Sequence, residues 1–283
     1  MTHTLTLLAD DLAFGEAPRW HNGALYLSDM HAHRVLRYSD SAGWDVVAEH
    51  DGPVSGLGWL PDGDMLVVSM HDRTILRHRN GVFEVHADLS DIATWHANDM
   101  IVAPDGTAYV GNFGFDIDTH PISPCTASIA RVTADGTVST AAAGLWFPNG
   151  MVIQPDGATM IVAESGTRVL TELTIAADGA LVEPRLWARL PDDALPDGIC
   201  LDAAGCVWAA SPTSREVLCL RRDGEVVDRI ATEQEAIACV FGGEDRRTLF
   251  ILTADSRTPA IARDVRTARV YAVRMDVAGA GLP

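Results

Sequence analysis

Four short stretches recur at one position of a repeating unit: Gly15-Glu16-Ala17-Pro18, His96-Ala97-Asn98-Asp99, Phe147-Pro148-Asn149-Gly150 and Leu195-Pro196-Asp197-Gly198. In each stretch an acidic or amide side chain precedes an apolar run, and the glycine of a turn follows seven or eight residues later. Those turn glycines are, in order, Gly23, Gly106, Gly157 and Gly205. A residue that holds one position in a repeat holds one position in space relative to that repeat, so the four polar side chains are expected to occupy equivalent places.

The whole chain repeats one plan: apolar segment, glycine turn, strand, loop, strand, and often a further strand. Copies recur roughly 40–50 residues apart, which is the period of propeller blades. They begin near Glu16, Gly56, Asn98, Asn149, Asp197 and Ala238. A competing β-sandwich would not explain a period this long. The sequence therefore predicts an all-β fold, a six-bladed β-propeller formed by residues 1–283 as one domain. The apolar run at residues 4–8 is expected to supply the outer strand of the last blade.

Composition limits the class of protein. The chain has 283 residues, of which 47% are hydrophobic, enough to bury a substantial core. Its formal net charge of -18 argues against nucleic acid and anionic membranes as partners. No apolar run approaches the roughly 18–20 residues of a membrane span. The first residues show no secretory signal pattern, and five cysteines without a CxxC pair indicate reduced thiols. We expect a cytoplasmic protein.

The recurring polar residues predict a metal site. In a propeller the first strand of each blade lines the central channel, so Glu16, Asn98, Asn149 and Asp197 should meet on the axis. Two carboxylates and two amide oxygens favour one hard divalent cation, Ca²⁺ first, with Mg²⁺, Mn²⁺ and Zn²⁺ as alternatives. Taken singly, Asn-Gly and Asp-Gly are also common turn dipeptides, and Asn or Asp before a strand is often a local cap. Four such residues at one repeat position favour the metal site.

These motifs in this order resemble the SMP-30/gluconolactonase/LRE group, also called regucalcin-like proteins. The resemblance covers nearly the whole chain and also includes Phe241-Gly242-Gly243. It implies a six-bladed propeller with a Ca²⁺-type metal on the axis and the hydrolysis of lactones, often sugar lactones. By position, Glu16, Asn149 and Asp197 match the metal ligands of the family, and Asn98 matches an Asn that contacts metal or substrate.

One position departs from the family pattern. Sugar lactonases of this group usually carry Arg two residues before the Asn that matches Asn98, and here that residue is His96. An Arg fork suits polyhydroxyl or acidic substrates, whereas an imidazole among aromatic rings suits a less polar ring. We therefore expect a small-molecule lactone less polar than gluconolactone. The predicted substrate contacts are Trp95, His96, Asn98, Phe113 and Trp146.

The implied mechanism is metal-assisted ester hydrolysis. The catalytic residue predicted to take the proton of the attacking water is Asp197, by family position, with Asp99 and His96 as rivals. His31, His33, His71 and His120 are interpreted as surface or loop histidines. Two other functions remain open: a calcium-binding or ligand-binding propeller without turnover, and a phosphotriester hydrolase using a similar cation site.

Overall fold

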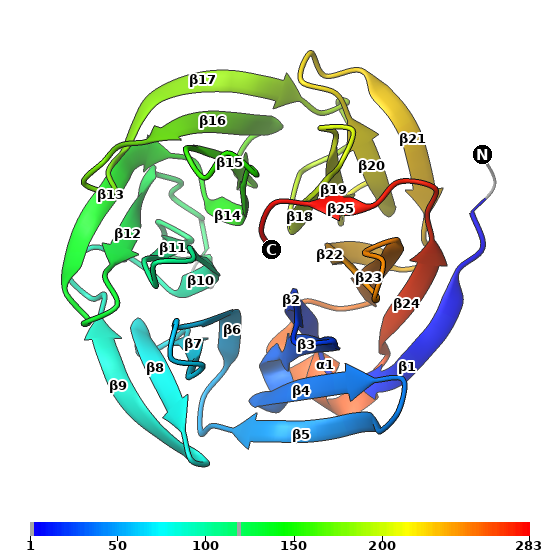
Figure 1. Ribbon diagram of the computed structural model, residues 1–283, viewed down its shortest axis with the longest axis horizontal. Coiled ribbons are helices and arrows are strands. Elements are labelled where there is room, and N and C mark those ends of the chain that lie inside the picture. Colours follow the sequence, from blue (N-terminus) through cyan, green and yellow to red (C-terminus); the bar gives the residue numbers. More distant parts are fainter. Residues whose placement is uncertain (1–2, 118–119) are drawn as a thin grey trace.

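The computed structural model describes residues 3–117 and 120–283, so residues 1–2 of the predicted domain and residues 118–119 of the long loop lie outside it. Six antiparallel sheets surround a common centre (Figure 1). Five of them have four strands and the remaining one has five. The predicted all-β fold and its six blades are confirmed.

Each blade is a meander whose first strand faces the axis. In the last blade, the outer strand comes from the start of the chain. Blade 1 comprises β2 (Gly15–His21), β3 (Ala24–Asp29), β4 (Arg34–Ser39) and β5 (Gly43–Glu49). Blade 2 comprises β6 (Val54–Trp59), β7 (Met65–Ser69), β8 (Thr74–Arg79) and β9 (Val82–Asp88). Blade 3 comprises β10 (Ala97–Val102), β11 (Ala108–Asn112), β12 (Ala127–Val132) and β13 (Val138–Leu145).

Blades 4 to 6 follow the same plan. Blade 4 comprises β14 (Pro148–Ile153), β15 (Thr159–Glu164), β16 (Val169–Ile175) and β17 (Leu181–Arg189). Blade 5 comprises β18 (Ile199–Asp202), β19 (Val207–Ser211), β20 (Glu216–Leu220) and β21 (Val226–Ala231), with β25 (Gly279–Ala280) added beside β18. Blade 6 comprises β22 (Glu235–Gly242), β23 (Thr248–Ala254), β24 (Ala268–Arg274) and β1 (Thr6–Leu12).

The N-terminal strand closes the ring. β1 pairs antiparallel with β24, so the first strand of the chain forms the outer edge of the last blade. This confirms the expected closure, although β1 begins and ends later than the run at residues 4–8. Closure ties the two ends of a chain of repeats together, which leaves no unpaired blade face.

The core lies between neighbouring blades. Leu25 and Leu27 of blade 1 pack in one buried cluster with Val240 and Leu252 of blade 6, and equivalent clusters fill the other interfaces. Because each sheet buries both faces against its neighbours, the blades hold one another in place around the axis. Four of the five cysteines are buried there as thiols, and Cys125 is exposed.

The two ends of the channel differ. We call the end where β2, β10 and β14 begin the mouth. At the opposite end β25 pairs with β18, and Leu282 forms a bridge with Ile153, so the C-terminal segment crosses that end of the axis (Figure 1).

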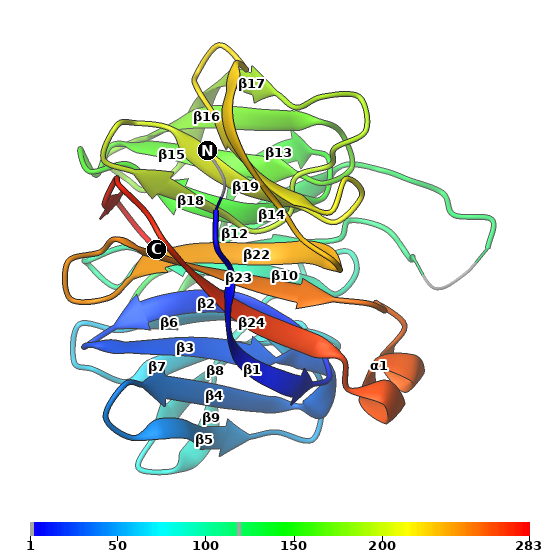
Figure 2. The ribbon, with the colours of Figure 1, turned by 90° about the vertical axis from the view of Figure 1, so that its right-hand side faces the viewer.

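The long connections of the chain lie on the mouth face. The loop after β11, described at residues 113–117 and 120–126, follows a strand that runs back toward the mouth. The connection after β23 carries the short helix α1 (Pro259–Val265), which packs on η1 (Met30–Ala32). Figure 2 shows both connections projecting from the same side of the ring. Within the described ranges, no helix has the length and apolar character needed to cross a bilayer.

Candidate metal and substrate site

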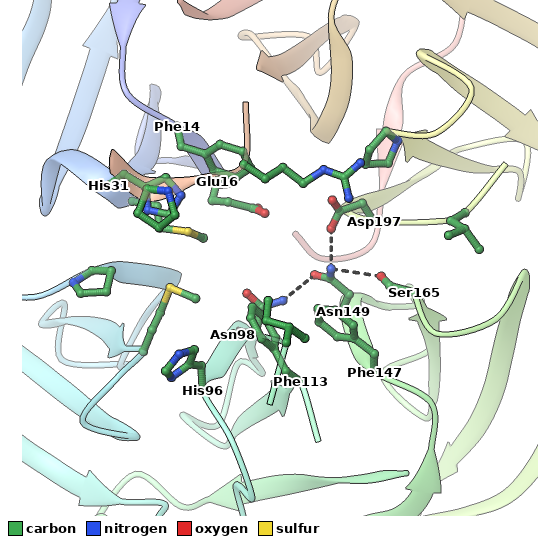
Figure 3. Close-up of a pocket in the computed structure, with 18 of the residues that line it drawn as sticks. Phe14, Glu16, His31, His96, Asn98, Phe113, Phe147, Asn149, Ser165 and Asp197 are labelled. Carbon is green, nitrogen blue, oxygen red and sulfur yellow. Dashed lines mark hydrogen bonds between the residues drawn. The ribbon is translucent and has the colours of Figure 1, made fainter. Parts of the chain in front are cut away.

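A cavity of about 320 Å³ opens at the mouth, directly over the axis (Figure 3). Its floor carries the four polar residues predicted from the repeat, and its walls come from the connections of all six blades. Among the described residues, those that line it are Phe14, Glu16, Met30, His31, Pro53, Met70, His71, His96, Asn98, Phe113, Ile117, Phe147, Asn149, Ser165, Leu195, Pro196, Asp197, Pro212, Thr213, Arg257 and Pro259.

The polar residues of the floor are connected by hydrogen bonds. Asn98 Nδ2 donates to Asn149 Oδ1 at 3.0 Å, and Asn149 Nδ2 donates to Asp197 Oδ1 and to Ser165 Oγ, the latter at 3.1 Å. The Glu16 carboxylate points into the same space from the opposite side (Figure 3). Four residues separated by up to 181 positions in sequence thus face one point. We call Glu16, Asn98, Asn149 and Asp197 the axial cluster.

A local irregularity turns these side chains toward the axis. The pairing of β2 with β3 slips between Glu16 and Arg19, and that of β10 with β11 slips between Ala97 and Met100. The pairing of β14 with β15 slips in the same way after Pro148. A bulge inserts an extra residue and re-aims the side chain beside it. The polar residue at the start of an inner strand is therefore aimed along the channel mouth instead of into a blade interface.

The glycines after Asn149 and Asp197 have a packing role. Neither Gly150 nor Gly198 has a positive φ, so the Asn-Gly and Asp-Gly pairs are not tight turns here. A Cβ on Gly150 would lie 2.5 Å from the backbone oxygen of Asp197, and one on Gly198 would lie 2.5 Å from the Cβ of Ala238. The missing side chains let adjacent inner strands approach closely, which brings the axial cluster together.

The electrostatics of the axial cluster match a cation. Burial, then the nearby Asp197 and Asp99 carboxylates, hold the pKa of Glu16 well above its ordinary value. Burial raises the pKa of Asp197 to about 7, and the charge of Arg257 opposes this rise. Two desolvated carboxylates that face one another are costly unless a positive charge lies between them. The donor set is all oxygen and fits a hard divalent cation such as Ca²⁺, Mg²⁺ or Mn²⁺.

Asp99, a predicted rival of Asp197 as base, has another partner. Its Oδ1 accepts hydrogen bonds from Arg19 Nη2 at 2.7 Å and from the backbone N–H of Met100 at 2.8 Å. Arg19 also donates to the backbone oxygen of Leu57, so this buried ion pair joins blades 1, 2 and 3 below the floor. Asp99 is absent from the described residues that line the cavity.

The predicted substrate contacts divide into two groups. His96, Asn98 and Phe113 line the cavity. Trp95 and Trp146 do not belong to the described lining. Trp95 packs against the ring of His96, with centroids 4.8 Å apart, and Trp146 is 37% exposed.

The interpretation of His31 as a surface or loop histidine was wrong, because His31 is a buried residue of η1. His71 does lie in an exposed turn, as that interpretation has it, but it also lines the cavity. Both follow the second strand of a blade and both line the cavity. His31 is buried beside Phe14, and burial lowers its pKa to about 4. His71 stacks on His96, with ring centroids 4.2 Å apart.

The repeat contained a signal for these missed residues. His31 and His71 each lie two residues beyond the end of a second strand, after Asp29 and Ser69. Phe113, Ser165 and Pro212 lie directly beyond the ends of the second strands β11, β15 and β19. The repeat position after the second strand therefore supplies the cavity walls, as the position before the first strand supplies the floor.

Another group of possible metal ligands lies away from the cavity. The group consists of one carboxylate oxygen of Asp202 and the sulfur atoms of Cys206 and Cys219, and these three atoms lie within 4.8 Å of one another. The Asp202 carboxylate, however, already accepts hydrogen bonds from two backbone N–H groups and from Trp208 Nε1. This carboxylate stabilises a turn and the adjacent strand.

Fold and site together define a six-bladed propeller with an axial cluster of oxygen ligands beneath an open cavity. Residues 14–255 match the family described as SMP-30/Gluconolactonase/LRE-like region, and the chain belongs to that family. It is 29% identical to pentonolactonase XacC of Haloferax volcanii over 99% of this chain and 97% of that protein. It is 27% identical to 6-deoxy-6-sulfogluconolactonase of Pseudomonas putida over 95% of this chain and 94% of that protein.

A solved structure shows the same fold. The chain superposes on a calcium-binding protein, regucalcin, from Agrobacterium tumefaciens with a TM-score of 0.82. The two chains are 21% identical, and the match covers 100% of this chain and 97% of the other.

Proposed function

We propose that this protein is a divalent-metal-dependent lactonase. The observation that carries the proposal is the axial cluster, with two facing carboxylates and two amides on the floor of an open cavity. Relatives that align over nearly the whole chain are named as sugar lactonases, which supports lactone hydrolysis. The regucalcin neighbour, described as calcium-binding, supports Ca²⁺ as the first candidate ion.

Glu16, Asn149 and Asp197 would hold the cation, with Asn98 at the edge of the cluster. When bound, the cation would supply Lewis-acid polarisation of the lactone carbonyl. The chain's own residues supply the remaining functions. Asn149 donates a hydrogen bond to Asp197 Oδ1, which fixes the carboxylate plane and leaves Oδ2 without a hydrogen-bond donor among the described residues.

Asp197 is the proposed general base. It accepts a proton from the attacking water and returns it to the ring oxygen as the acyl–oxygen bond breaks, which gives a hydroxy acid. An adjacent cation would keep this carboxylate ionised, which is the form that accepts a proton. Asp99 is less suited because Arg19 and the Met100 N–H hold its Oδ1 below the floor. His96, on the wall, is assigned to substrate contact.

The cavity favours a lactone less polar than gluconolactone. Much of its wall is apolar, including Phe113, Ile117 and Phe147. Ser165 Oγ donates to the backbone oxygen of Pro196, and Thr213 Oγ1 donates to the backbone oxygen of Asp193. A buried sugar hydroxyl without a partner would cost about 1–3 kcal/mol.

A lactone panel tests the function. Sugar, aliphatic and aromatic lactones would be assayed with chelator-treated protein and with the same protein reloaded with Ca²⁺, Mg²⁺ or Mn²⁺. We expect hydrolysis that disappears with chelation and returns with one of the ions. A protein that binds the ion but opens no lactone would support the binding-propeller alternative, and a phosphotriester in the same panel tests the third function. Turnover that persists unchanged in chelated, metal-free protein would refute metal dependence.

A further inference from the structure

Arg257 brings a cationic side chain to the cavity. The chain contains no lysine, and among the described lining residues Arg257 is the only arginine. It lies between the end of β23 and the start of α1, and its side chain is 55% exposed. It is close enough to the axial cluster for its charge to oppose the rise in the pKa of Asp197.

The Arg257 guanidinium is hydrogen-bonded to the protein through its Nε edge. Arg257 Nε donates to Glu235 Oε2 at 2.6 Å, and Glu235 is the first residue of β22. The helix α1, which begins two residues after Arg257, packs on η1. Neither Nη atom donates a hydrogen bond to a residue in the described part of the chain. The four N–H groups of the two Nη atoms are thus left for a ligand.

Apart from His31, His71 and His96, the rest of the wall offers few hydrogen-bonding groups to a ligand. The hydroxyls of Ser165 and Thr213 already donate to backbone oxygens, and much of the remaining wall is apolar, including Phe113, Ile117 and Phe147. A ligand that matches this cavity has an apolar body, an ester group at the axial cluster and one anionic group at Arg257. A planar guanidinium binds a carboxylate through two parallel hydrogen bonds, which no neutral group reproduces.

We propose that Arg257, positioned by Glu235, selects lactones that carry a free carboxylate on a ring with few hydroxyl groups. This inference rests on the proposed lactonase function and names the substrate class of the same site. Glu235 is a positioning residue, because it contacts the Arg257 Nε edge and does not belong to the described lining.

The test uses two lactones that differ only in charge: γ-carboxy-γ-butyrolactone and its carboxamide. The measured quantity is the ratio of their kcat/KM values. In Arg257→Gln we expect this ratio to fall about 10–100-fold, mainly through KM of the carboxylate, since hydrogen bonds to a charged partner are lost. Arg263→Gln is the matched control, since Arg263 is an exposed residue of α1 outside the described lining, and it should leave the ratio unchanged. Glu235→Gln should lower the ratio less than Arg257→Gln does.

A binding measurement separates this inference from the proposed function. Calorimetry would compare α-hydroxyglutarate, the ring-opened product, with γ-hydroxybutyrate, which lacks the second carboxylate. We expect α-hydroxyglutarate to bind more tightly to the unmodified protein and to lose that advantage in Arg257→Gln. If no lactone is hydrolysed but this preference depends on Arg257, the anion site stands and the lactonase proposal fails. An unchanged kcat/KM ratio in Arg257→Gln, or equal affinity for the two hydroxy acids, would overturn the inference.

Discussion

Replacing Asp197 by Asn should make the metal-free protein more stable while removing its response to a cation. The pKa of Asp197 in the folded protein is about 7, against an ordinary value of 3.8. The folded state therefore binds more protons than the unfolded state between these values, and metal-free stability falls as pH rises from about 4 to about 7. Asn carries no charge at any pH, and its side-chain oxygen still accepts the hydrogen bond from Asn149.

The size of the effect follows from the shift. About three pKa units at 1.36 kcal/mol each give about 4 kcal/mol when Asp197 is fully ionised. Asp197 keeps partial contact with solvent, which screens its charge, so we expect about half of this at pH 8. For a chain of this size that corresponds to a rise in Tm of about 5 °C in the metal-free protein.

The assay is thermal unfolding at pH 8 with chelator and with saturating Ca²⁺. The unmodified protein should gain Tm on adding Ca²⁺, because ligand binding to the folded state stabilises it. Asp197→Asn should have a higher Tm in chelator than the unmodified protein, and its Tm should rise little on adding Ca²⁺. Asp99→Asn is the control: it leaves Arg19 buried without its partner and should destabilise by roughly 3–5 kcal/mol with or without the ion. The reasoning is refuted if Asp197→Asn lowers the metal-free Tm at pH 8 or keeps the full response to Ca²⁺.

Three further outcomes are expected. Glu16→Gln should weaken Ca²⁺ binding by roughly two orders of magnitude in a calorimetric titration, because a charged ligand is lost, and unchanged affinity would refute its role. On a lactone panel, kcat/KM should be several-fold higher for an aliphatic or aromatic lactone than for gluconolactone, and the reverse order would count against the apolar wall. His96→Arg should shift kcat/KM toward polyhydroxyl lactones with Ca²⁺ affinity unchanged; a uniform loss of roughly 10²–10⁴ together with loss of an acid limb near pH 6.5 would instead make His96 the base.

The sequence determined the fold because the repeat is local. Each apolar run, glycine turn and strand could be recognised within one blade, and the period then specified how many blades surround the axis. The same logic brought Glu16, Asn98, Asn149 and Asp197 together without any knowledge of contacts, since equivalent positions in a closed ring face one centre. It also predicted that the first run of the chain would close the ring, which β1 does beside β24.

Only the tertiary structure decided which neighbouring side chains join that centre. Trp95 and Trp146 are each adjacent in sequence to a wall residue, yet neither belongs to the described lining. His31, His71 and Arg257 come from connections whose direction depends on strand polarity and on the packing of α1 against η1. The sequence also did not reveal the partner of Asp99, because Arg19 lies in another blade, 80 residues away in the chain. The repeat period determines which backbone positions reach the site. Side-chain rotamers, loop paths and ion pairs depend on contacts between blades, and the sequence of a single repeat does not contain those contacts.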